Sequence, residues 1–204
     1  MLIETGKPMF PSRPRSPART FEAFKSLSAV SDIVDYHIPA YGDSVAIRFD
    51  DGVTYAAVDF QTFLARIKVM IRFLERHEEN QKVIATFCKN RPEWDMTAMA
   101  TLYTGHTLFP LDTTMHTVEL RHLLSLNPPD FVLVSGAQLQ RMRGLLSQLN
   151  LSTQVLFADL MTVFEDEIPH PHELRETDIS IARLVETTRS EEHTSELQSQ
   201  FRIS

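Results

Sequence analysis

The sequence predicts an α/β fold built on a mainly parallel sheet with covering helices, and three observations support it. Apolar runs of strand length alternate with amphipathic stretches of helix length between residues 44 and 158. The segments between them are short and contain the glycine, proline and asparagine residues that end helices and form turns. This order requires crossover connections, which place neighbouring strands parallel. The 43% hydrophobic and 23% charged residues of the 204-residue chain are typical of a globular domain.

The first predicted elements are a hairpin and a long helix. Residues 44–49 form the first strand, Asp50-Asp51-Gly52 supplies the turn, and residues 53–55 return as the second strand. Alternation places three side chains of the first strand on one face: Val45, Ile47 and Phe49. Asp59 then caps a helix that runs to about His77, because apolar residues recur there at helical spacing. They are Phe63, Ile67, Met70, Ile71 and Leu74.

The remaining elements alternate strictly. The predicted strands are Val83–Cys88, Thr107–Leu111, Phe131–Val134 and Gln154–Ala158, and the helices are 92–104, 117–126 and 137–149. Val83–Cys88 is continuously apolar, as expected of a strand buried on both faces. Pro92 occupies the favoured first position of its helix, and Gly105 ends it. Asn127-Pro128-Pro129 ends the next helix.

The chain divides into four segments. Residues 1–20 form a disordered arm rich in proline and arginine, and residues 21–160 form the α/β unit. Residues 161–188 turn acidic and irregular, which predicts a surface helix and then a linker. Residues 189–204 resemble a translated sequencing adapter and are excluded from the fold, with a natural polar tail as the alternative. We therefore expect the natural protein to continue beyond Thr188.

Composition excludes several classes of protein. No stretch approaches the roughly 18–20 apolar residues of a membrane-spanning helix, and Met1–Phe10 lacks the apolar core of a signal peptide. The net charge of −7 argues against nucleic acid as a partner. The single cysteine, Cys88, excludes an internal disulfide and fits a reducing compartment. We expect a cytoplasmic protein and leave peripheral membrane association and the oligomeric state open.

The sequence contains no phosphate-binding loop. Such loops need several glycines, because backbone amides must approach phosphate oxygens without a side chain between them. The six glycines of the chain are Gly6, Gly42, Gly52, Gly105, Gly136 and Gly144. No pair has the spacing of a dinucleotide-binding or Walker loop, and none is followed by Lys-Ser or Lys-Thr.

Other reactive side chains favour structural roles. The spaced histidines, His116 with His122 and His170 with His172, lack the converging ligands of a metal site. Cys88 ends an apolar strand as a buried thiol, and Ser135-Gly136 has no nucleophile elbow around it. Asp112 follows a strand, where α/β sites gather, but Asp112-Thr113-Thr114 better fits a side-chain-to-backbone turn. Arg141 and Arg143 with Lys89 and Arg91 form either a basic rim or, as we favour, a solvated face.

The run Asn90-Arg91-Pro92-Glu93-Trp94 after a strand resembles the N-terminal region of the AMP-forming acyl-CoA synthetases, the adenylate-forming ligases. Other segments are similar to this family in the same order: Asp51–Tyr55 with the helix from Asp59, Ala98–Gly105, Phe109–Asp112, Glu119–Leu126 and Phe131–Ser135. The resemblance covers Thr20 to Thr188 and is strongest to the long-chain fatty acid branch. It departs from the family where Glu79–Val83 replaces a Gly-Asp turn and where His106 replaces a small residue.

The resemblance implies a fragment of an ATP-dependent ligase. The whole enzyme would use ATP, magnesium and coenzyme A to activate a carboxylic acid, in this branch a fatty acid. The family's Thr-Ser-Gly-Thr-Thr-Gly-x-Pro-Lys-Gly loop and all its later motifs are absent from the sequence. No catalytic, cofactor-binding or metal-binding residue is therefore assigned, and we expect the chain by itself to be inactive. The alternative is a stand-alone, non-catalytic α/β module that acts through protein contacts.

Overall fold

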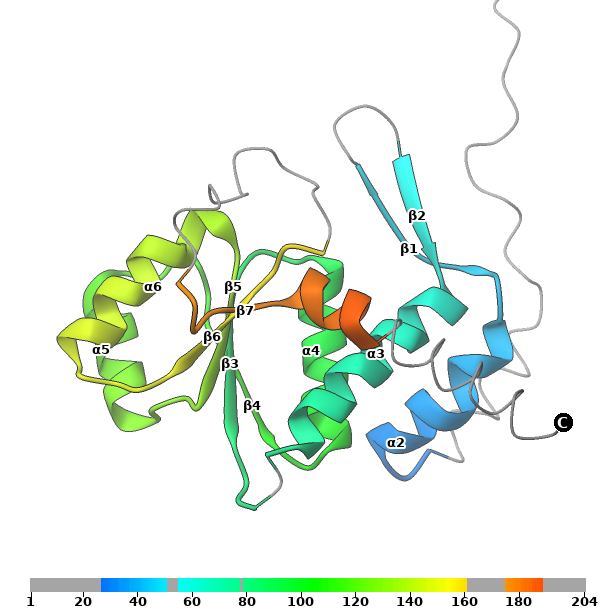
Figure 1. The fold of residues 1–204 in the computed structure, drawn as a ribbon, viewed down its shortest axis with the longest axis horizontal. Coiled ribbons are helices and arrows are strands. Elements are labelled where there is room, and N and C mark those ends of the chain that lie inside the picture. The colour runs from blue at the N-terminus through cyan, green and yellow to red at the C-terminus, as the bar shows by residue number, and fades with distance from the viewer. Residues whose placement is uncertain (1–26, 51–54, 78, 161–174, 189–204) are drawn as a thin grey trace, which may run out of the picture.

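The computed structural model describes residues 27–50, 55–77, 79–160 and 175–188, and Figure 1 shows their arrangement. The described part begins with the short helix α2 (Val30–Asp32), a π-helical turn (Ile33–His37) and a 3-10 turn (Pro39–Tyr41). The predicted arm over residues 1–20, the hairpin turn at Gly52 and the adapter-like residues 189–204 lie outside the described residues. None of the described helices is long and apolar enough to cross a membrane.

A five-stranded parallel sheet forms the centre of the fold, as the alternating sequence predicts. Its strands lie in the order β4-β3-β5-β6-β7. They are β3 (Val83–Phe87), β4 (Thr107–Pro110), β5 (Phe131–Val134), β6 (Gln154–Phe157) and β7 (Ile179–Ser180). Along the chain the sheet starts at the inner strand β3, adds β4 on one side and then β5 on the other. This doubly wound order has its topological switch point between β3 and β5.

Helices cover both faces of the sheet (Figure 1). They are α3 (Phe60–Glu75), α4 (Pro92–Tyr103), α5 (Thr117–Leu126) and α6 (Gly136–Gln148). Side chains of the strands alternate between two cores. The core beneath α3 and α4 contains Ile84, Cys88, Phe131, Leu133, Leu156 and Ala158. The core beneath α5 and α6 contains Ala85, Phe87, Val132, Val134, Val155 and Phe157.

The long helix α3 forms as its sequence predicts. The Asp59 side chain accepts a hydrogen bond of 2.6 Å from the Thr62 backbone N–H, which caps the first turn. This interaction lowers the pKa of the Asp59 carboxyl below its ordinary value of 3.8. At the other end of the helix, the Phe73 ring packs edge-on against Phe131 of β5, with 5.4 Å between ring centroids. Helix α3 thus joins the hairpin to the sheet.

The hairpin differs in detail from the prediction. Strand β1 (Val45–Asp50) pairs antiparallel with β2 (Tyr55–Asp59), so the second strand is longer and ends later than residues 53–55. The pairing register shifts between Val45 and Ile47. Because of this irregularity, Val45 is 43% exposed while Ala46 and Ile47 both pack against the core. The strict alternation predicted for this strand was wrong at that point.

The described end of the predicted linker is part of the fold. Residues 161–174 lie outside the described residues, but Ile179–Ser180 forms β7 beside β6, and residues 181–188 are helical. Ile181 is fully buried, and Leu184 packs against the same core. The prediction of a linker was therefore wrong over residues 175–188. The sequence did not show this strand, because two paired residues and one buried isoleucine carry too little periodicity to be recognised as an element.

His106, which replaces a small residue of the family pattern, is buried and hydrogen-bonded. It is 7% exposed, and its Nδ1 accepts a hydrogen bond of 3.4 Å from the Lys82 N–H. Its Nε2 lies 3.5 Å from the Leu74 carbonyl oxygen. The imidazole therefore connects the start of β4 to the chain before β3 and to the last turn of α3.

The buried sheet implies that the same substitution, leucine to alanine, lowers the free energy of unfolding far more at a buried position than at an exposed one. Leu133→Ala, at a fully buried position of β5, should lower the free energy of unfolding by about 2–5 kcal/mol. Leu126→Ala, at a position 62% exposed, should change it by less than about 0.5 kcal/mol. Urea unfolding of both variants measures the difference, and equal losses would contradict the two-sided core.

Candidate functional site

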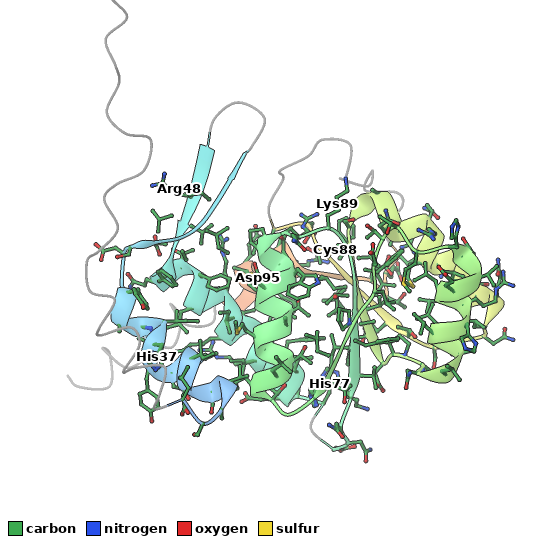
Figure 2. The ribbon with its side chains drawn as sticks, turned by 180° about the vertical axis from the view of Figure 1, so that it is seen from behind. His37, Arg48, His77, Cys88, Lys89 and Asp95 are labelled. Carbon is green, nitrogen blue, oxygen red and sulfur yellow. The ribbon has the colours of Figure 1, made fainter. Side chains whose placement is uncertain are left out.

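The carboxyl ends of β3, β4 and β5 meet at one edge of the sheet, where ligands bind in open α/β folds. A cavity of about 630 Å³ opens there beside β3 and β4. It is lined by Cys88, Lys89, Asn90, Trp94, Pro110, Leu111, Asp112 and Thr113. Figure 2 shows Cys88 and Lys89 at this end of the sheet, near Asp95 in the first turn of α4. By position, this is the candidate site of the described chain.

Asp112 adopts the side-chain-to-backbone turn predicted for it. Its Oδ1 accepts hydrogen bonds from the Thr114 N–H and the Thr114 hydroxyl, both at 2.8 Å. The backbone hydrogen bond, followed by the hydroxyl, lowers the pKa of this carboxyl below its ordinary value of 3.8. Asp112 therefore stabilises the loop after β4 as a carboxylate, and a low pKa makes it a poor general acid.

Arg141 lies on α6 and holds the same loop. Its Nη1 donates to the Thr113 carbonyl oxygen at 2.9 Å, and its Nη2 donates to the Met115 carbonyl oxygen. The guanidinium also lies over the Phe87 ring, 5.5 Å from the centroid. The partly buried Arg141 side chain is therefore held by specific partners, unlike the solvated charge that we favoured for it.

Arg91 and Glu93 form a buried pair at the start of α4. The Arg91 Nε donates to Glu93 Oε2 at 3.1 Å, and its Nη2 donates to Oε1 at 3.0 Å. The Arg91 side chain is 9% exposed and the Glu93 side chain is fully buried. Two parallel hydrogen bonds satisfy both charges, which makes the burial tolerable. From the sequence, Glu93 was expected only to oppose the helix dipole. Its burial could not be predicted, because the neighbouring residues do not show that other parts of the chain cover the turn between β3 and α4.

The remaining candidate residues named from the sequence are Cys88, Ser135 and the spaced histidines. Cys88 is 7% exposed and Ser135, which precedes α6, is 1% exposed. The His116 N–H donates to Glu119 Oε2 at 3.0 Å, closing the first turn of α5, while His122 is exposed on that helix. His170 and His172 lie outside the described residues. In the described ranges, no three His, Cys, Asp or Glu side chains gather as metal ligands.

The starts of helices α4 and α5 at this edge do not suit the phosphates of ATP. Helix α4 begins with Pro92, which has no N–H, and carries Glu93 and Asp95 in its first turn. Glu93 is neutralised by Arg91, but the exposed Asp95 carboxylate repels an anion that the helix dipole would otherwise attract. At α5, Glu119 already occupies the His116 N–H. These two helix starts therefore do not fit the phosphates of ATP, and no catalytic step is derived through ATP or magnesium.

Comparisons with known proteins agree with this architecture. The family model described as AMP-binding enzyme matches residues 34–196, which extends into the adapter-like residues. No curated protein matches the sequence.

Solved structures match the fold at low sequence identity. The A domain of carboxylic acid reductase from Segniliparus rugosus, in complex with AMP and a co-purified carboxylic acid, has a TM-score of 0.65 at 14% identity, covering 81% of this chain and 31% of that one. The luciferase-like enzyme of Zophobas morio has a TM-score of 0.61 at 16% identity, covering 77% and 33%. A putative long-chain-fatty-acid CoA ligase from Rhodopseudomonas palustris has a TM-score of 0.59 at 16% identity, covering 76% and 36%. The chain therefore spans about a third of the length of these relatives.

The turn at Asp112 predicts a pH dependence. A carboxyl whose pKa is lowered on folding stabilises the protein at pH values above 3.8, the ordinary pKa of the group. This contribution is lost as the pH falls through the lower pKa of the folded state. Thr114→Val removes the hydroxyl and keeps the N–H, so it should raise the pKa of Asp112 part of the way towards 3.8. A pH titration of the Asp112 carboxyl by NMR measures this shift. Thr117→Val is the matched control, and an Asp112 pKa at or above its ordinary value in the unaltered chain would disprove the turn's effect.

Proposed function

The chain belongs to the AMP-binding enzyme family, and we propose that it is the N-terminal part of an AMP-forming ligase that joins a fatty acid to coenzyme A. The match over residues 34–196 carries the proposal. The whole enzyme activates the carboxylate with ATP and magnesium, releases AMP, and passes the acyl group to the thiol of coenzyme A. It acts in the cytoplasm, with membrane association as a further option for a fatty acid substrate.

The substrate class rests on weaker support than the family. The segment Asn90–Trp94 resembles the long-chain fatty acid branch, and a similar solved structure is described as a putative long-chain-fatty-acid CoA ligase. Another is described as a benzoate CoA ligase from Burkholderia xenovorans. Because the sequence identity is low, both likenesses concern the fold alone. The preference for a fatty acid among the carboxylic acids therefore rests on the motif.

The proposed role of this segment is to support the site. Its buried Arg91–Glu93 pair fixes the turn after β3, and Arg141 fixes the loop after β4. These loops form a rigid edge against which the rest of the enzyme can place its phosphate-binding loop. Electrostatic stabilisation of the transferred phosphate depends on that loop and on magnesium, which later parts of the protein supply.

The chain by itself should neither bind nor hydrolyse ATP. Its sequence has no glycine-rich phosphate loop, and the exposed Asp95 in the first turn of α4 disfavours an anion there. Isothermal titration of the 204-residue chain with ATP and magnesium should therefore show no heat of binding at micromolar concentrations. A whole acyl-CoA ligase serves as the positive control. Micromolar affinity of this chain for ATP would refute the assignment of the phosphate site to another segment of the enzyme.

Sequencing of the source locus across the Thr188 codon tests the parent enzyme. We expect the reading frame to leave the adapter-like sequence and continue into Thr-Ser-Gly-Thr-Thr-Gly-x-Pro-Lys-Gly. The protein encoded by that frame should form AMP and an acyl-CoA from a fatty acid, ATP and coenzyme A, measured by release of AMP. A frame that ends after Ser204, as the present sequence does, would favour the stand-alone interaction module instead.

A further inference from the structure

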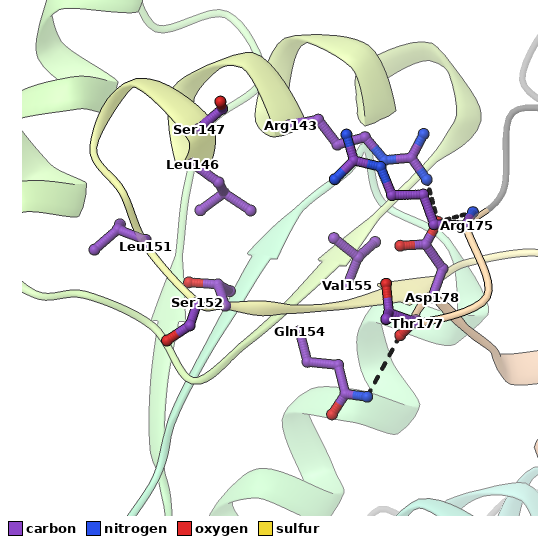
Figure 3. A pocket seen from close by; sticks show the side chains of 11 residues that line it. Arg143, Leu146, Ser147, Leu151, Ser152, Gln154, Val155, Arg175, Thr177 and Asp178 are labelled. Carbon is purple, nitrogen blue, oxygen red and sulfur yellow. Dashed lines mark hydrogen bonds and ion pairs between the residues drawn. The ribbon is translucent and has the colours of Figure 1, made fainter.

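A second cavity lies at the opposite, amino-terminal edge of the sheet (Figure 3). Its volume is about 490 Å³, and it lies between the second half of α6, the start of β6 and the turn before β7. Its lining combines apolar, hydroxyl and charged side chains: Arg143, Leu146, Ser147, Leu151, Ser152, Thr153, Gln154, Val155, Arg175, Thr177 and Asp178. The described lining is mostly polar, and Leu146, Leu151 and Val155 are its apolar part.

Arg143 and Asp178 form the buried wall of the cavity. The Arg143 side chain is 9% exposed and the Asp178 side chain is 5% exposed, and Arg143 Nη2 donates to Asp178 Oδ2. The same carboxylate oxygen accepts a hydrogen bond of 2.7 Å from the Arg175 backbone N–H. Asp178 therefore neutralises Arg143 and also fixes the turn that carries Arg175 into the cavity.

No described residue balances the charge of Arg175 in this cavity. Its side chain makes no hydrogen bond or ion pair with the residues that the structure describes, and Asp178 is the only acidic residue among the described ones in the lining. Figure 3 shows both guanidinium groups on the same side of the cavity, above Val155. Among the described lining residues, two positive charges thus stand against one negative charge.

The remaining walls strengthen this preference for an anion. Leu146 and Val155 are each 6% exposed and form a low-dielectric floor, over which a charge–charge attraction is stronger than in water. Ser147, Ser152 and Thr177 place neutral hydroxyl donors around the opening. Thr153 and Gln154 already donate to the carbonyl oxygens of Pro129 and Thr177.

We propose that this cavity binds a small phosphate-type oxyanion, with the Arg175 guanidinium as its main contact. A guanidinium presents parallel N–H donors that match two oxygens of a phosphate, and the hydroxyls accommodate the others. The site is independent of the ligase assignment, because it uses the opposite edge of the sheet. The anion is either free inorganic phosphate or the phosphate of a larger molecule.

Binding of inorganic phosphate to the 204-residue chain tests the proposal. Titration followed by NMR chemical shifts at constant ionic strength should show saturable changes at Arg175, Thr177 and Ser152. Arg175→Gln should weaken binding by about tenfold or more, since a charged hydrogen-bond donor is lost. This substitution keeps the backbone N–H that Asp178 needs, so the fold should be retained. Parallel titrations with pyrophosphate and AMP identify the source, because tighter binding of either indicates a phosphate carried by a larger molecule.

Arg183→Gln is the matched control, since it removes the same charge from an exposed position on the helical residues 181–188. It should bind phosphate as tightly as the unaltered chain. The proposal is overturned if phosphate gives no saturable change, if Arg175→Gln binds as tightly as the unaltered chain, or if Arg183→Gln weakens binding equally. An equal response to sodium chloride would also overturn it, by showing a general effect of salt.

Discussion

The fold depends on one constraint, the burial of a parallel sheet on both faces. Strands β3, β5 and β6 place alternate side chains in two different cores, so that Ile84, Phe131 and Leu156 face α3 and α4, while Ala85, Val132 and Val155 face α5 and α6. A strand of this kind has no polar face and is mostly apolar, although β3 also buries Thr86. A shift of one residue in pairing would exchange the two sets and place each against the wrong helices. The registers of the sheet and the positions of the helices are therefore determined together.

Charged residues next to this sheet are held by specific partners. Arg91 pairs with Glu93 at the carboxyl edge, Arg143 pairs with Asp178 at the amino edge, and Arg141 donates to two backbone carbonyls after β4. A guanidinium suits these positions because it stays charged and offers several donors in a fixed plane. Removing one partner would leave an unpaired charge in a poorly solvated place. The arginines at both edges thus stabilise loops, and the exposed Arg175 differs from them in having no such partner among the described residues.

The architecture agrees with a supporting role in a larger enzyme. The described chain has the sheet and helices of the adenylate-forming fold, yet Pro92 and Asp95 at the start of α4 and the Glu119 contact at the start of α5 disfavour phosphate there. The hairpin β1–β2 pairs with no further strand within the described ranges, and two strands alone are marginal in water. Its stability here comes from Ala46, Ile47 and Val58, which pack against the core beneath α3.

Sequence alone determined the type and order of most elements, because strand period, helix period and end signals are local. Asp59 as a helix cap, Pro92 as a first helical residue and the turn at Asp112 followed from residues at most three positions away. The same local reading recognised the family but could assign no site residue, since its chemical motifs are absent.

Tertiary structure decided what depends on residues distant in the chain. The irregular register at Val45, the pairing of β7 with β6, the contact of Arg141 with Thr113 and the pair of Arg143 with Asp178 join segments that no periodicity relates. Burial of Glu93 likewise became visible only when the helices were packed on the sheet. The physical reason is that desolvation and pairing of a charge depend on the whole surroundings in space, whereas a backbone conformation depends largely on its nearest neighbours along the chain.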